Sequence, residues 1–215
     1  FSQEYLIRER KSSYYQKALV FICNYFMKGF GDKPKKKVKS IKIDLMNINI
    51  LKHDAYKYIK NHNFKKAEQI YIQCLREGII DKEIYSSLAN LYKQIGQFNN
   101  AIKYFKKALR LSNNDANLFF NLGLIFFEQK NVHSAIDCYV KGLNIDPNNT
   151  FALLNLANMY EYNSQFELAL DVIKKCSNLN SNDPKVIFAH GNILKSIGRY
   201  NEALKKYNEV FILSG

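Results

Sequence analysis

The chain has 215 residues, is 47% apolar and carries a formal net charge of +13. This apolar content is sufficient for a substantial core, and the three prolines leave long helices allowed almost everywhere. The charge is uneven: residues 1–47 hold eleven Lys and Arg against four Asp and Glu, and residues 48–215 hold twenty-one against fifteen. The distribution therefore excludes a strongly basic surface over most of the chain.

Residues 1–26 are expected to form an N-terminal helical segment, with an apolar run of ten residues at 18–27. The run is too short to cross a bilayer, which takes about 20 residues. Basic residues precede it, but no small-residue cleavage site follows. Three interpretations stay open: part of an upstream helix, an amphipathic anchor, or sequence foreign to a mature protein that starts at Met27. Because the first residue is Phe1 and the last repeat is unfinished, we expect the chain to be a fragment.

Residues 27–47 form a basic leader, with six lysines between Lys33 and Lys42. Lysines at this density repel one another and resist compaction, so a solvated linker is the preferred interpretation. No aromatic residues alternate with the lysines and no arginine is present, and the segment therefore does not favour nucleic acid. Recruitment to a membrane surface through Ala18–Lys42 is retained as a secondary alternative.

A period of 34 residues begins at Ile48 and is clearest in residues 116–149. There, apolar and small residues spaced i, i+3, i+4, i+7 predict one face of a first helix, a second set predicts a second helix, and Pro147 closes the unit. The first set is Phe119, Leu122, Gly123 and Phe126, and the second is Ala135, Tyr139 and Gly142. The expected units are 48–81, 82–115, 116–149, 150–183 and the truncated 184–215.

This pattern resembles the tetratricopeptide repeat (TPR) family, with Phe119 where that family often has Trp and Gly142 where it usually has Ala. The resemblance implies an all-α, right-handed superhelix (an α-solenoid) of antiparallel helix pairs. Stacking would bury the apolar faces between neighbouring units. The C-terminal end of the array, which no polar helix follows, is expected to expose an apolar face.

Residues able to perform catalysis or bind metal are scattered. The four histidines make no metal-binding pair, no glycine-rich phosphate loop is present, and no nucleophile lies beside a base and an orienting group. His190 is expected to be a neutral core histidine, and the cysteines are expected to be small buried hydrophobes in a reducing compartment. We therefore expect that this stretch is not itself an enzyme, with no cofactor, no metal and no small-molecule substrate, and we expect a cytoplasmic location.

The resemblance implies that peptides or partner helices bind along the concave surface of the first helices. Side-chain amides on this surface can pair with an extended backbone, as in the asparagine ladder of the O-linked N-acetylglucosamine transferases, which the array resembles here. The amides are Asn90, Asn121, Asn155, Asn158 and Asn192. The general abundance of Asn in this sequence is the competing explanation. Lys52 matches one of the residues needed to clamp a chaperone tail, but the other residues of that set are replaced.

An apolar strip is expected between these asparagines, at positions that do not form the core of the repeat. Its members are Phe120, Leu124, Phe127, Phe151, Leu154 and Phe188. The preferred function is a protein–protein interaction scaffold that binds an extended or helical peptide segment in this groove. The alternative is the substrate-recruiting arm of a larger transferase whose catalytic domain lies beyond residue 215.

Overall fold

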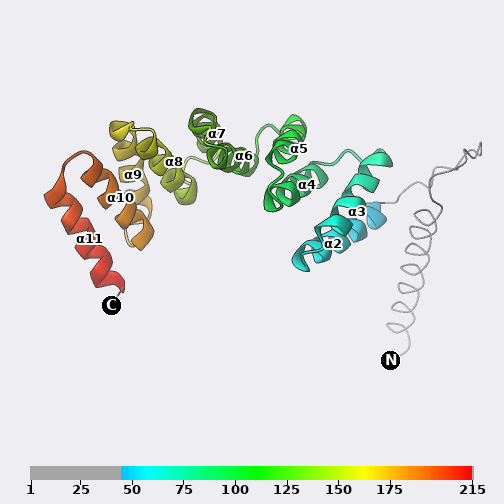
Figure 1. Ribbon diagram of the computed structural model, residues 1–215, viewed down its shortest axis with the longest axis horizontal. Coiled ribbons are helices and arrows are strands. Elements are labelled where there is room, and N and C mark those ends of the chain that lie inside the picture. The colour runs from blue at the N-terminus through cyan, green and yellow to red at the C-terminus, as the bar shows by residue number, and fades with distance from the viewer. Residues whose placement is uncertain (1–44, 215) are drawn as a thin grey trace, which may run out of the picture. The chain divides into compact units, whose positions relative to one another are not determined.

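The structure is a computed structural model and describes residues 45–214, which form ten α-helices and no strand (Figure 1). The helices are α2 (Leu45–Lys60), α3 (Phe64–Arg76), α4 (Lys82–Gln94), α5 (Phe98–Leu111), α6 (Ala116–Glu128), α7 (Val132–Ile145), α8 (Thr150–Tyr162), α9 (Phe166–Leu179), α10 (Pro184–Ser196) and α11 (Tyr200–Ser214). The expectations for segment 1–26, for most of the leader and for membrane recruitment through Ala18–Lys42 concern residues outside the described part.

Short polar side chains start many of these helices. Asn63, Asn131 and Asn149 each accept a hydrogen bond from the backbone amide three residues later, and Asp81 and Asp183 accept one from the amide two residues later. Such caps satisfy amides that have no partner inside the helix. The Asn and Asp residues that precede these helices are thereby explained by local structure.

The turn between the two helices of each pair uses a left-handed backbone at the same place, the fifteenth position of every unit. Glycine occupies it in two units, Gly96 and Gly198, where φ is 73° and 80°. His62, Lys130 and Ser164 occupy it in the other three, with φ of 56°, 63° and 59°. Residues with a Cβ pay a steric cost in this conformation, so these three turns are strained.

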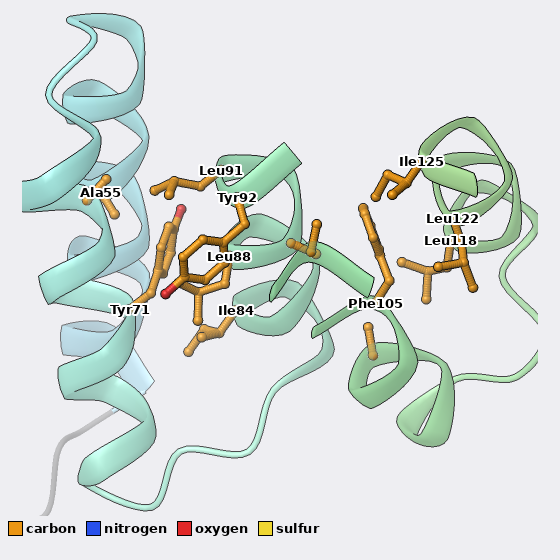
Figure 2. Close-up of a cluster of buried hydrophobic side chains, with 14 of the residues drawn as sticks. Ala55, Tyr71, Ile84, Leu88, Leu91, Tyr92, Phe105, Leu118, Leu122 and Ile125 are labelled. Atoms are coloured by element: carbon orange, nitrogen blue, oxygen red, sulfur yellow. The ribbon is translucent and has the colours of Figure 1, made fainter. Parts of the chain in front are cut away.

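The buried side chains form an apolar core that continues from unit to unit. Figure 2 shows Tyr71 of α3 facing Leu88 of α4, and Phe105 of α5 facing Leu122 of α6. Two further clusters continue through α6–α8 and α8–α11, and Leu143 packs against both. Each helix pair therefore stacks on the next, and the expected all-α superhelix of antiparallel helix pairs is confirmed.

Small residues allow two helices of a pair to approach closely. Gly123 of α6 lies against the ring of Tyr139 of α7, and Gly142 of α7 lies against the ring of Phe120 of α6. The Phe120 ring occupies the space that an alanine methyl group would take at position 142. Phe120 is therefore only 6% exposed. The prediction that Phe120 belongs to an exposed strip was wrong, because the glycine opposite opens a place for its ring in the core.

Two other expectations are confirmed within the described residues. Cys74, Cys138 and Cys176 are buried free thiols, and Cys23 lies outside the described part. Apolar surface is exposed at the last helix: Leu204 of α11 is 59% exposed, whereas Leu170, its counterpart in the preceding unit, is 5% exposed. Between residues 45 and 214, every helix is too short or too polar to traverse a bilayer.

Candidate partner-binding face

One side of the array is formed by matching positions of the five first helices, α2, α4, α6, α8 and α10. We call it the first-helix face. Its residues are Lys52, Tyr56, Glu83, Asn90, Lys93, Asn121, Leu124, Phe127, Phe151, Leu154, Asn155, Asn158, Glu161, Tyr162, Phe188, Asn192 and Ser196. Because a helix brings residues spaced by three and four onto one side, each helix contributes one stripe to this face.

Polar contacts join the stripes of the first three helices. The Lys52 ammonium of α2 lies 2.7 Å from the Glu83 carboxylate of α4, and it also pairs with Asp81 at 2.6 Å. The Lys93 ammonium of α4 donates to the amide oxygen of Asn121 of α6 at 2.7 Å. The stripes of α2, α4 and α6 are therefore direct neighbours.

The remaining stripes are joined in the same way. The rings of Phe127 on α6 and Tyr162 on α8 meet edge-to-face, with centroids 5.5 Å apart. The hydroxyl of Ser196 on α10 donates to Glu161 on α8 at 2.8 Å. With these contacts, the first-helix face is continuous across all five described units.

Three of the five predicted asparagines are already engaged within the chain. Asn121 accepts from Lys93 and donates to the carbonyl of Asn117 at 2.9 Å. Asn155 donates to the Tyr139 hydroxyl at 3.1 Å. These amides link neighbouring helices, although each keeps hydrogen-bonding capacity for a further partner.

The other amides differ in whether they already make hydrogen bonds within the chain. Asn192 accepts from the hydroxyl of Tyr207 at 2.9 Å. Asn90 is half-buried and Asn158 is exposed, and neither side chain makes a hydrogen bond to another described residue. Asn90 and Asn158 are thus the amides most available to an incoming backbone. Asn155 fixes the hydroxyl of the buried Tyr139, and Asn192 fixes the hydroxyl of the half-buried Tyr207.

Large apolar members of the face are exposed on α2, α8 and α10, and Tyr56 of α2 is 52% exposed. Phe151 is 62% exposed and Phe188 is 51% exposed, whereas Leu124, Phe127 and Leu154 are half-buried. Tyr162, at the end of α8, is 59% exposed and was missed by the sequence prediction. Large apolar side chains held in the open in this way are typical of a contact surface for another molecule.

Lys93 is the unusual cation of the face. Burial lowers the pKa of its ammonium, an effect that Glu128 partly opposes. No carboxylate among the described residues forms an ion pair with it, so its single protein acceptor is the neutral Asn121 amide. The sequence prediction of the face did not include Lys93, Glu161 and Tyr162. They occupy the twelfth and thirteenth positions of their units, and inspection of those positions in the sequence would have identified all three as members of the face.

Three family models match segments of the array. A model described as TPR repeat covers residues 89–130, and two models described as tetratricopeptide repeat cover residues 116–149 and 138–171. Together with the helix pairs, these matches show tetratricopeptide repeats within residues 89–171. Among curated proteins, none matches the chain in sequence.

Solved structures share the fold. MamA from Desulfovibrio magneticus RS-1 is 16% identical with a TM-score of 0.72, and the match covers 78% of this chain and 94% of that one. YrrB, described as a TPR protein with an unusual peptide-binding site, is 16% identical with a TM-score of 0.68, covering 81% and 89%. PilF from Pseudomonas aeruginosa is 19% identical with a TM-score of 0.66, covering 78% and 77%.

Proposed function

Because the chain carries tetratricopeptide repeats, we propose that it is a protein-interaction scaffold whose first-helix face binds an extended or helical segment of a partner protein. The observation that carries the proposal is the group of exposed aromatic side chains, Phe151, Tyr162 and Phe188, on consecutive first helices. Aromatic side chains supply large contact areas at low entropic cost and are enriched at protein interfaces. The alternative, a recruiting arm of a larger transferase, would use the same group to bind its substrate.

The two kinds of side chain on the face suggest complementary roles. Apolar side chains of the partner would pack on Phe151 and Phe188, and the amides of Asn90 and Asn158 would pair with its backbone. An amide both donates and accepts, and it can therefore hold an extended backbone without reading its side chains. Three buried free thiols among the described residues fit a reducing compartment such as the cytoplasm.

The experiment compares capture of partner proteins by the unaltered chain and by a variant carrying Phe151→Ala, Tyr162→Ala and Phe188→Ala. We expect the variant to lose the captured proteins while its circular dichroism spectrum remains helical. A matched control carries Leu168→Ala and Leu179→Ala, which remove exposed apolar side chains from α9, outside the first-helix face. Equal capture by the aromatic variant and the unaltered chain would contradict the proposal.

A further inference from the structure

One junction between units differs from the others in its chemistry. At each junction between two units, three matching positions meet. One lies on the second helix of the earlier unit, and the other two lie on the first and second helices of the following unit. Along the chain these triplets are Leu75, Leu88 and Tyr104; Leu109, Leu122 and Cys138; Leu143, Leu156 and Val172; and Ser177, His190 and Lys206. The first three triplets have no charged member, whereas the last carries a hydroxyl, an imidazole and an ammonium. All three positions are polar at this junction, so the junction as a whole is polar.

The polar triplet is ordered by hydrogen bonds. The hydroxyl of Ser177 donates to the carbonyl of Ile173 at 2.9 Å, and its oxygen lies 3.3 Å from Nδ1 of His190. With the hydroxyl proton directed to Ile173, we assign Nδ1 of His190 as the donor to Ser177. The ring is therefore held with Nε2 left for another partner, as an acceptor when neutral and as a donor when protonated.

A cavity of about 280 Å³ opens beside this triplet, between α9, α10 and α11. Lys174 and Asn178 of α9 and Ser181 of the turn that follows α9 line it together with the triplet. None of these residues belongs to the first-helix face, and the cavity is therefore distinct from the proposed partner-binding surface. Its polar lining lacks a carboxylate. The hydroxyls of Ser177 and Ser181 donate to other groups of the chain, so ammonium groups, the Asn178 amide and the His190 ring supply its hydrogen-bond donors.

The charge around the cavity is only partly balanced. Lys206 pairs with Glu209 of α11 at 2.8 Å, while Lys174 of α9 makes no ion pair with a described residue. Burial lowers the pKa of His190, and the ammonium groups of Lys206 and Lys174 lower it further. The Glu209 carboxylate opposes this lowering of the pKa, and the Arg199 guanidinium adds to it. Arg199 is itself paired with Glu202. A bound anion would relieve the repulsion among these cations.

We propose that the cavity between α9, α10 and α11 is a binding site for a phosphate group, held by Lys174, Lys206 and His190, with Ser177 fixing the orientation of the ring. A phosphate group offers three strong acceptor oxygens and close to two negative charges, which matches several converging donors better than a single carboxylate does. The Lys206 ammonium would exchange Glu209 for the phosphate.

The test is a titration of the whole chain with sodium phosphate, against sodium chloride at equal ionic strength, observed through the His190 ring by nuclear magnetic resonance. We expect phosphate alone to shift the ring signals in a saturable way and to raise the pKa of His190, because the anion favours the imidazolium. A matching titration with O-phosphoserine distinguishes the source. A stronger response to phosphoserine assigns the site to a phosphorylated side chain, and an equal response assigns it to free phosphate.

Three variants extend the test of the phosphate site. The double variant Ser177→Leu with Lys206→Val gives this junction the apolar character of the other junctions and keeps the His190 ring as the reporter. The protein should stay folded, and its affinity for phosphate should fall at least about tenfold, or 1.4 kcal/mol. Glu209→Gln frees Lys206 and should tighten binding, and Lys205→Ala, which removes an exposed neighbouring charge, should leave it unchanged. Identical responses to phosphate and chloride, or undiminished binding by the double variant, would overturn the proposal.

Discussion

At the residue scale, Gly142 and Phe120 depend on each other. Gly142→Ala places a methyl group where the Phe120 ring lies, and we expect a loss of about 1–3 kcal/mol in the free energy of unfolding. Urea unfolding followed by circular dichroism measures it. In a Phe120→Leu background the same Gly142→Ala change should cost less, because the smaller side chain vacates the space. Equal costs in both backgrounds would show that the ring is not the cause.

A second prediction concerns the strained turn residue Ser164. Its left-handed backbone costs a residue with a Cβ more than it costs glycine, so Ser164→Gly is expected to stabilise the chain by about 0.5–1 kcal/mol. The matched control is Gly96→Ala, at the equivalent position two units earlier, which should destabilise by a similar amount. Thermal unfolding of both variants checks the pair, and a destabilised Ser164→Gly protein would refute the strain argument.

At the element scale, Asp81 joins two helices: it caps α4 and pairs with Lys52 of α2. Burial alone would raise its pKa, but the hydrogen bond from Lys52 and those from backbone amides outweigh burial and lower it. A carboxyl whose pKa is lower in the folded state contributes stability above its unfolded pKa of about 3.9, and that stability is lost as the pH falls through the folded value.

We therefore expect acid to destabilise the unaltered chain more steeply than an Asp81→Asn variant, which keeps a capping side chain but cannot ionise. Urea unfolding at a series of pH values between neutral and about 3 compares the two slopes, and at neutral pH the unaltered chain should be the more stable. Parallel stability curves would mean that the Asp81 charge contributes nothing to the junction.

The helices themselves were predictable from the sequence, since spacing fixed both members of each pair around residues such as Leu122 and Tyr139. The candidate site was predictable only in part. Phe120 looked like a surface residue because spacing alone does not reveal that Gly142, 22 residues later, opens a place for its ring. The second role of Asn155, bound to the Tyr139 hydroxyl, also depends on a contact between units that a single repeat does not contain.

At the scale of the whole molecule, each unit is covered by a neighbour on both sides except at the two ends of the described array. In such arrays, stability depends on contacts between adjacent units, so an end unit opens more readily than an inner one. We expect the amides of α11 to exchange with deuterium faster than those of α6 and α7, as measured by mass spectrometry. Equal protection throughout would indicate that the array opens as one cooperative unit.

The four contacts that join neighbouring first helices lie on the surface where we place the partner. A ligand covering Lys93 and Asn121 would shield their hydrogen bond from water, and polar contacts strengthen as water is excluded. A ligand covering Phe127 and Tyr162 would bury the edge-to-face contact of their rings. A partner bound on the first-helix face would then restrict changes in the spacing between units. A partner seated on α6 and α8 alone would thereby restrict how a second ligand is received on α4 or α10.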